Sequence, residues 1–440
     1  MQTTSHPTVS RRIFLKHTAA AATLASCPAW VPSAVLGRDA EPSPSNKITL
    51  GCIGVGGRGR GVMESLITLP EAKVLAVCDT YEDRRQAAKK VVDHQAHNTD
   101  CAMYHDWREV IARQDIDAVL IAPQDHWHAL IATAAARAGK DMYCEKPLGV
   151  SIEECQAIRD AVKKHGRIFQ TGTQQRSERN FRFACELSRH GYLGKLHTVQ
   201  VGGPGPSYQP AYKGSLDPQP VPTGFDWDMW LGPAPKKPYN PGRVSWPDWY
   251  LIWDYCAGFI VNWGVHHLDI ALWGCPALAE ETFEIECRGT YRKEGWTDNI
   301  SSWEGQFTYP SGLKLVYTDD QHSKGGCRFI GAEGWIHVDR GFWEAKPESL
   351  REIKLKSSDV RLHESNHHGQ DFLQSVKSRR PPVADIDAGH RASYFGMLVD
   401  IAARLQRKIK WDPKLEQFVD CPEAVPLLHR PMRLPWKLAV

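Results

Sequence analysis

Short apolar segments and helix-forming segments alternate over residues 47–174, and this alternation constrains the fold more than any other feature of the sequence. The apolar segments read ITLGCIGV, KVLAVCD, AVLIA, DMYC and RIFQTG, and helix-forming sequence separates each from the next. Strands that alternate with helices of this length form a parallel sheet with helices on both faces. We therefore predict a doubly wound α/β domain over residues 47–174.

The pattern changes after about residue 175. Residues 203–250 are dense in proline, glycine and tryptophan, which indicates a long ordered loop. Residues Thr282–Asp339 read as successive strands with turns at YPSG and GAEG, and two helices, Asn366–Arg379 and Ala388–Lys408, follow. The sequence thus predicts a second, α+β domain over 175–440 with a large, mostly antiparallel open sheet.

The N-terminal segment, residues 1–40, resembles an export signal. Arg11 and Arg12 are followed by Ile-Phe-Leu-Lys and by an apolar run too short to span a bilayer. This pattern is typical of the Tat pathway, and a basic tail is the alternative. A lipid on Cys27 is a second alternative, which the adjacent Pro28 disfavours. We expect an exported, periplasmic protein with no membrane span.

Composition and charge narrow the choice of partners. The chain is 42% hydrophobic and 24% charged, as in ordinary globular proteins. Without residues 1–40 it loses four basic and one acidic residue from totals of 54 and 51 and becomes nearly neutral, which argues against nucleic acid as a partner. The 12 cysteines include no CxxC pair, so we expect mostly free, buried thiols.

The first predicted strand is followed by a glycine-rich turn. Gly54, Gly56 and Gly59 have GxGxxG spacing, which allows a pyrophosphate to approach the backbone at a helix N-terminus. Asp79 ends the second strand, where a carboxylate accepts hydrogen bonds from a ribose diol and repels a 2′-phosphate. We predict a dinucleotide site that prefers NAD to NADP, although arginines in the same turn leave NADP open.

Two further strand ends border the predicted cofactor crevice. The segment IAPQDHWHAL ends the third strand, and its histidine spacing is more typical of helix capping than of a metal site, so we expect no metal. DMYC ends in Glu145-Lys146-Pro147, and the proline biases the lysine away from helical geometry, toward the crevice. We expect Glu145 to keep Lys146 charged and oriented, or to contact the ribose. The predicted cofactor-binding residues are Gly54, Gly56, Gly57, Arg58, Gly59, Asp79, His126, Trp127, Glu145 and Lys146.

A helix predicted over Gly258–Gly274 carries a polar stripe beside an apolar one. A row of amide, imidazole and carboxylate groups next to a core face suits a helix that lines a cleft. The alternative is a capped helix with one satisfied, half-buried histidine. We interpret His267 as structural. The polar stripe comprises Asn262, His266, Asp269 and Trp273, and the apolar stripe comprises Val261, Val265, Leu268 and Leu272.

Seven of the 16 tryptophans lie between Trp227 and Trp273. Flat aromatic faces stack well on the C–H surfaces of sugars, which favours a carbohydrate pocket. Large aromatic side chains that pin an irregular loop are an equally good explanation, and the sequence leaves both open.

With these residues, the chain resembles the Gfo/Idh/MocA (glucose-fructose oxidoreductase/inositol dehydrogenase) family over roughly residues 47–440. The motifs are GVGGRGRG with Asp79, AGKDMYCEKPLG, NWGVHHLDIALW and GAEGWIHVDRG. The export signal and the tryptophan-rich loop resemble the exported, sugar-active branch. The resemblance implies an N-terminal Rossmann domain and a second-domain sheet that covers the cofactor.

The resemblance also implies catalytic roles. Lys146 is expected beside the nicotinamide, bonded to the substrate hydroxyl, and His266 matches the general base. Asn262 stands where many members have aspartate, so proton acceptance falls on His266, supported by Asp269 one turn away.

The function implied is hydride transfer from a secondary hydroxyl carbon of a sugar, polyol or glycoside to a nicotinamide. An exported enzyme has no cytosolic cofactor pool, so we expect tightly bound NAD. The alternatives are a redox-neutral lyase, glycosidase or epimerase and a non-catalytic sugar- or cofactor-binding module, which the intact Lys146 and His266 oppose. By analogy we expect a homo-oligomer.

Overall fold

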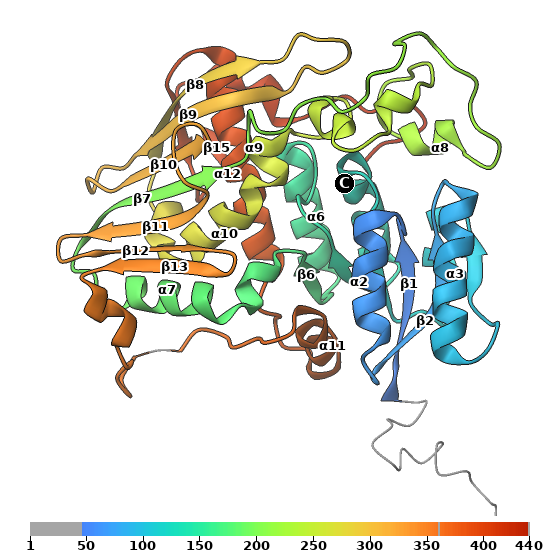
Figure 1. The fold of residues 1–440 in the computed structure, drawn as a ribbon, viewed down its shortest axis with the longest axis horizontal. Coiled ribbons are helices and arrows are strands. Elements are labelled where there is room, and N and C mark those ends of the chain that lie inside the picture. Colours follow the sequence, from blue (N-terminus) through green and yellow to red (C-terminus); the bar gives the residue numbers. More distant parts are fainter. Residues whose placement is uncertain (1–45, 360, 439–440) are drawn as a thin grey trace, which may run out of the picture. The chain divides into compact units, whose positions relative to one another are not determined.

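A computed structural model describes residues 46–359 and 361–438 (Figure 1). The predicted export signal, residues 1–40 with Cys27, lies outside the described residues. Within the described part of the chain, no helix combines the length and the apolar character that crossing a membrane requires. Eleven described cysteines are free, and all of them except Cys287 are buried, as predicted.

The first domain is built on six parallel strands in the order β3-β2-β1-β4-β5-β6, which confirms the predicted doubly wound sheet. The chain order reverses between β1 and β4, which creates a crevice at the carboxyl ends of these strands. The prediction missed β3 and α4, because three- and six-residue elements are too short for a periodic signal. The strands are β1 (Ile48–Ile53), β2 (Ala72–Cys78), β3 (Ala102–Tyr104), β4 (Ala118–Ile121), β5 (Asp141–Cys144) and β6 (Phe169–Thr171). The helices are α2 (Gly57–Ile67), α3 (Glu82–Ala96), α4 (Trp107–Ala112), α5 (His128–Arg137) and α6 (Ile152–Lys164).

The second domain contains a nine-stranded sheet in the order β13-β12-β11-β7-β10-β9-β8-β14-β15. Only the β7–β10 pair is parallel among its described strands, so the predicted mostly antiparallel sheet is confirmed. The strands are β7 (Leu196–Gly203), β8 (Phe283–Tyr291), β9 (Ile300–Thr308), β10 (Lys314–Asp319), β11 (Gly326–Gly331), β12 (Trp335–Asp339), β13 (Phe342–Lys346), β14 (Ile409–Asp412) and β15 (Gln417–Phe418). The longer helices are α7 (Arg179–Arg189), α10 (Gly264–Gly274), α11 (His368–Ser378) and α12 (Ile386–Leu405).

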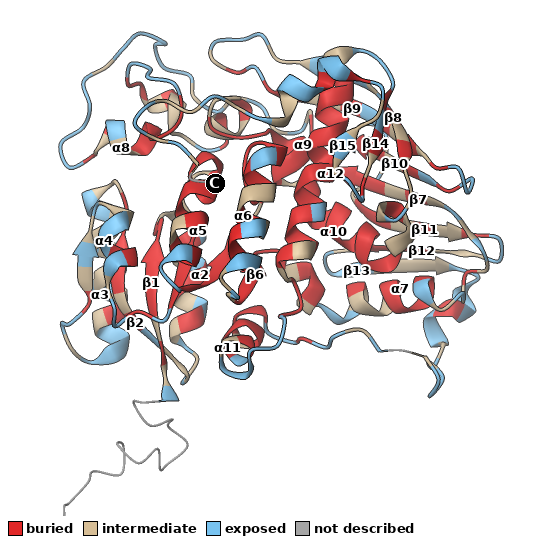
Figure 2. Cartoon of the chain, turned by 180° about the vertical axis from the view of Figure 1, so that it is seen from behind, coloured by how far each residue is buried: buried red, intermediate tan, exposed pale blue. Residues whose placement is uncertain are grey.

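The helix predicted over Gly258–Gly274 is two helices. A short α9 (Phe259–Asn262) precedes α10, and Trp263 lies between them. Every residue of α10 is buried, so its polar side chains need partners inside the protein (Figure 2).

The long helix α12 joins the two sheets. It contacts α6 and β6 of the first domain and α10 and β8 of the second. Thr171 at the end of β6 donates its backbone N–H to the carbonyl of Ala384, just before α12, and a Cβ on Gly389 of α12 would lie 2.0 Å from the Thr171 hydroxyl. One hydrophobic core runs through both domains. Residues from both domains can therefore be held in one rigid site.

Residues 204–258, here called the covering loop, connect β7 to α9 and include the short helix α8 (Trp227–Leu231). The loop has a small core of its own, in which Trp227 and Trp230 are buried. Its Phe225 ring stacks on Tyr81 of the first domain at 3.8 Å between ring centroids. The predicted ordered loop is thus confirmed.

The packing around the glycine-rich turn after β1 predicts how two glycine substitutions change stability. A Cβ on Gly59 would lie 1.8 Å from the Gly54 carbonyl oxygen, whereas a Cβ on Gly61 meets no described atom within 4 Å. Gly59→Ala should therefore lower the free energy of unfolding by about 1–3 kcal/mol and weaken dinucleotide binding. Gly61→Ala, in the same helix, should raise it by about 0.5–1 kcal/mol. Urea unfolding and cofactor titration measure both effects, and equal behaviour of the two variants would contradict the prediction.

Candidate active site

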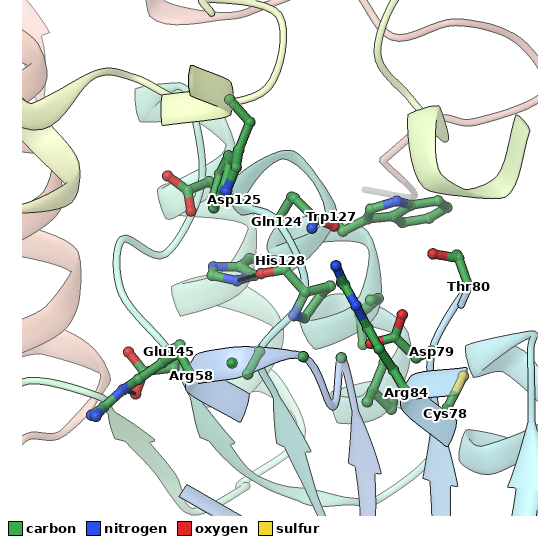
Figure 3. A pocket seen from close by; sticks show the side chains of 18 of the residues that line it. Arg58, Cys78, Asp79, Thr80, Arg84, Gln124, Asp125, Trp127, His128 and Glu145 are labelled. Carbon is green, nitrogen blue, oxygen red and sulfur yellow. Dashed lines mark hydrogen bonds and ion pairs between the residues drawn. The ribbon is translucent and has the colours of Figure 1, made fainter. Parts of the chain in front are cut away.

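A cavity of about 490 Å³ lies along the carboxyl ends of β1, β2, β4 and β5 (Figure 3). Its first-domain lining includes Gly54, Asp79, Asp125, Glu145 and Lys146. The residues that line it from the second domain all belong to the covering loop, so this loop covers the cavity, and contact of the second-domain sheet with a bound cofactor stays a prediction.

The turn after β1 fits a pyrophosphate group. Gly54 has a φ of +80°, and a Cβ there would lie 2.3 Å from the backbone nitrogen of Pro123. Helix α2 begins at Gly57, and Gly56 before it has no side chain to cap the helix. The first-turn N–H groups and the positive end of the helix dipole are thus free to receive an anion. Gly56, Gly57 and Arg58 line the cavity, whereas Gly59 lies behind Gly54.

Asp79 follows β2 and is 8% exposed. Its Oδ2 accepts from the Val55 N–H at 2.9 Å and its Oδ1 from the Tyr81 N–H at 3.1 Å, so the carboxylate also holds the glycine-rich turn. Burial raises the pKa of Asp79, and the Arg84 guanidinium opposes this shift. Arg84 lines the same cavity and lies beside Asp79 in Figure 3, yet the sequence reasoning missed it.

Glu145 has a partner other than the predicted one. Its Oε1 accepts from Arg58 Nε at 2.8 Å and from Gln174 Nε2 at 3.1 Å. It was expected to keep Lys146 charged and oriented or to contact the ribose, and its side-chain hydrogen bonds with described residues go to Arg58, Gln174 and the Lys146 backbone N–H. Its negative charge still favours the charged form of Lys146. The pairing partly neutralises the positive charge of Arg58 and so weakens the attraction of Arg58 for a 2′-phosphate.

Lys146 reaches from the first domain to the second. Its Nζ donates to Asn262 Oδ1 at 2.7 Å and to the Asn262 carbonyl oxygen at 3.1 Å. Burial lowers the pKa of Lys146, and the negative charges of Glu145 and Asp125 oppose this effect. The structure thus brings together two residues that the sequence placed 116 positions apart.

Asn262 has a second partner that the sequence reasoning missed. Its Nδ2 donates to Asp125 Oδ2 at 2.7 Å. Asp125 is 2% exposed and begins the 3₁₀ turn that follows β4. Burial raises its pKa, while the charges of His128 and Lys146 act in the opposite direction. The signal was present in the sequence, since Asp125 is a polar residue just beyond the carboxyl end of a central strand.

His266 lies on α10 and is 4% exposed. Its Nδ1 has no hydrogen-bond partner among the described residues. Burial lowers its pKa well below the ordinary value, and the positive charges of Lys146 and Arg340 act in the same direction. Burial therefore favours the neutral imidazole form of His266.

Asp269 does not support His266 as predicted. Its two carboxylate oxygens accept from Arg176 Nε and Nη2, both at 2.7 Å, and it is fully buried. The helical spacing was right, but a guanidinium from 93 positions earlier in the chain occupies the carboxylate.

His126 is not among the residues that line the cavity, and neither are Asn262, His266 and Asp269, so the role of His126 as a cofactor ligand stays a prediction. Its ring nitrogens lie 3.2 Å from the Tyr255 carbonyl oxygen and 3.0 Å from that of Trp230, both in the covering loop. Burial lowers its pKa to about 4, so the neutral ring anchors the loop. Its neighbours Trp127 and His128 do line the cavity.

Among residues 46–359 and 361–438, no three His, Cys, Asp or Glu side chains form a group that could hold a metal ion.

Two of the tryptophans confirm that aromatic side chains pin the loop, and the carbohydrate pocket stays a prediction. Trp227 and Trp230 are buried and pin the covering loop. Trp246 and Trp249 line the cavity, and Trp246 is 61% exposed. Tyr208 lies edge-on to the Trp246 ring, with 5.8 Å between ring centroids.

His267 was interpreted as structural. Its Nδ1 lies 2.6 Å from the Gly202 carbonyl oxygen.

Comparison with known proteins gives matches over most of the chain. Residues 48–173 match the NAD-binding Rossmann fold of the Gfo/Idh/MocA oxidoreductase family, and residues 187–438 match the C-terminal alpha/beta domain of that family. Myo-inositol 2-dehydrogenase of Thermotoga maritima is 31% identical over 397 residues, which cover 84% of this chain and 99% of the relative.

Solved structures share the fold at lower identity. Aldose-aldose oxidoreductase from Caulobacter crescentus, complexed with glycerol, has a TM-score of 0.61 at 19% identity, over 83% of this chain and 99% of that one. Apo scyllo-inositol dehydrogenase from Lactobacillus casei has a TM-score of 0.55 at 16% identity, over 83% and 98%.

The Arg176–Asp269 pair predicts a stability effect. Asp269→Ala leaves a buried guanidinium without its partner and should lower the free energy of unfolding by about 3–5 kcal/mol. Glu64→Ala removes the more exposed Arg60–Glu64 pair and should cost less than about 1 kcal/mol. Chemical denaturation of both variants measures the difference, and a loss at Asp269 no larger than that at Glu64 would refute the structural role.

Proposed function

The chain belongs to the Gfo/Idh/MocA oxidoreductase family and is a nicotinamide-dependent oxidoreductase of sugars or polyols, and we propose that it oxidises a secondary hydroxyl group beside Lys146. One observation carries this proposal. The Lys146 ammonium is held 2.7 Å from Asn262 Oδ1, at the carboxyl edge that also carries the glycine-rich turn and Asp79.

Each proposed catalytic residue has a defined chemical task. The bound nicotinamide supplies the hydride acceptor. Lys146 donates a hydrogen bond to the substrate oxygen and stabilises the negative charge that develops on it. His266 accepts the hydroxyl proton, because its depressed pKa keeps the ring neutral and its Nδ1 lacks a hydrogen-bond partner among the described residues.

The proposed substrate is a cyclic polyol or a sugar. The relative from Thermotoga maritima is named a myo-inositol 2-dehydrogenase, which makes inositols the first candidates. The exposed face of Trp246, with Trp249 beside it in the cavity lining, suits the C–H face of a sugar ring.

We also propose that the cofactor stays bound between turnovers. The covering loop is fastened to the first domain where Glu82 N–H donates to the Gly224 carbonyl oxygen at 2.8 Å and Asp226 N–H to that of Thr80 at 3.1 Å. Trp436 of the C-terminal tail lies edge-on to Trp127, with 4.8 Å between ring centroids. Retention accords with the proposed export through residues 1–40, since no cytosolic pool is then available. Assembly as a homo-oligomer remains part of the proposal.

The decisive experiment identifies the cofactor that co-purifies and then screens inositols and sugars for its reduction, followed by absorbance. Lys146→Ala should lower the rate of reduction by about 10²–10⁴-fold or more while cofactor remains bound, because it removes the charge that stabilises the alkoxide. Lys164→Ala, an exposed lysine on α6, is the matched control and should react at the wild-type rate. Wild-type turnover by Lys146→Ala would overturn the active site, and glycoside cleavage without net reduction would replace oxidation by redox-neutral chemistry.

Asp79 leads us to propose NAD over NADP. Its buried carboxylate repels a 2′-phosphate, so Asp79→Ser should shift the ratio of NADP to NAD affinity by about tenfold or more toward NADP, with Arg84 then free to pair with the phosphate. Asp83→Ser removes an exposed carboxylate nearby and should leave the ratio unchanged. Titration of the cofactor-free variants with both dinucleotides measures it, and an unchanged ratio in Asp79→Ser would contradict the assignment.

A further inference from the structure

Three side chains form a continuous polar chain at the site. Lys146 follows β5, Asn262 ends α9 and Asp125 follows β4. The Lys146 ammonium donates to Asn262 Oδ1 at 2.7 Å, and Asn262 Nδ2 donates to Asp125 Oδ2 at 2.7 Å. A side-chain amide thus lies between a cation and a carboxylate.

The amide can occupy this position in one orientation only. Its oxygen accepts hydrogen bonds and its nitrogen donates them. A flipped Asn262 would direct its NH₂ group at the Lys146 ammonium and its oxygen at the Asp125 carboxylate, so both hydrogen bonds would be lost. Asp125 therefore determines that the amide oxygen faces Lys146.

Asp125 is a buried carboxylate, and no arginine or lysine in the described part of the chain forms a hydrogen bond or an ion pair with it. A buried carboxylate needs hydrogen bonds and opposite charge close by. Asn262 supplies the hydrogen bond, the Cys256 thiol a second one, and the charges of Lys146 and His128 lie near enough to favour its ionised form. The arrangement is that of an ion pair with one amide inserted between its members.

We propose that Asp125 is a positioning residue that holds Lys146 oriented and protonated through the side-chain amide of Asn262. This inference rests on the proposed role of Lys146 as the group that stabilises the substrate alkoxide. It also answers the difficulty that an amide at position 262 carries no charge, because the carboxylate stands one residue further along the same hydrogen-bonded chain.

The charged groups around Lys146 and Asp125 agree with this role. Burial lowers the pKa of Lys146, so the ammonium form depends on nearby negative charge. Without Asp125 the lysine would lose its proton at lower pH, and a rate that needs the ammonium would then decline at lower pH. The groups that act on Lys146 or Asp125 are Glu145, Arg58, Cys256, His128, His266, Tyr250, Cys144 and Glu154.

The test is the dependence of kcat on pH in the holoenzyme, with the polyol or sugar found in the screen. Asp125→Asn keeps the shape and removes the charge, so the basic limb of the profile should move to lower pH by about 1–3 units. The amide oxygen of the substituted side chain can still accept from Asn262 Nδ2, so loss of the charge is the main change, and kcat at the optimum should fall by about tenfold or more. Asp400→Asn removes a buried carboxylate on α12 that pairs with Arg404 and should leave the profile unchanged.

The exchange variant Asp125→Asn/Asn262→Asp provides the sharper test. It places the carboxylate in direct contact with Lys146 and an amide donor behind it, so the basic limb should return to the wild-type pH or above and the lost rate should be largely recovered. A purely structural role for Asp125 predicts a lower Tm, an unmoved basic limb and no rescue by the exchange, and this result would overturn the proposal.

The exchange variant also decides the question if Asp125→Asn folds poorly, because it keeps one charge and one amide in the same volume. If the exchange variant has the wild-type Tm but its basic limb still lies at lower pH, the proposed action of Asp125 on Lys146 through Asn262 is refuted. Failure of the proposed function can be told apart from failure of the Asp125 proposal. If the proposed function is wrong, Lys146→Ala keeps full activity, whatever the Asp125 variants do.

Discussion

The hydrogen bond between Lys146 and Asn262 joins the two domains at the site, and it depends on the core that both domains share. Lys146 comes from the end of a parallel strand and Asn262 from a helix that packs on the second sheet. A bond of 2.7 Å between domains requires that they do not slide relative to each other. Helix α12 prevents sliding, because it packs on β6 and α6 on one side and on α10 and β8 on the other.

Charge balance is the second constraint on this interior. Buried carboxylates are costly unless opposite charge or hydrogen-bond donors meet them. Glu145 meets Arg58, and Asp269 meets Arg176 in a bidentate pair. Asp125 meets the amide of Asn262, and through it the Lys146 ammonium. The same pairings leave Lys146 and His266, the two residues proposed to act on the substrate hydroxyl, without a carboxylate in direct contact among the described residues.

The covering loop is held in a fixed shape, and it also presents an aromatic side chain to the cavity. Its buried aromatic residues give it a fixed shape, and the Tyr81–Phe225 stack and His126 attach it to the first domain. Trp246 remains exposed on the cavity side of this rigid segment. A loop that is preorganised in this way presents its aromatic face without an ordering cost on binding.

Local patterns in the sequence determined much of this protein. Strand and helix alternation indicated the parallel sheet, glycine spacing with Asp79 indicated the dinucleotide turn, and strand-end and helical periodicity selected Lys146, Asn262 and His266. These features depend on residues close together in the chain. Tertiary structure alone decided the partners: Asp125 with Asn262 across 137 positions, Asp269 with Arg176 across 93 and Glu145 with Arg58 across 87. The physical reason is that a buried charge is neutralised by whichever side chain the fold brings beside it, and sequence spacing carries no record of that neighbour.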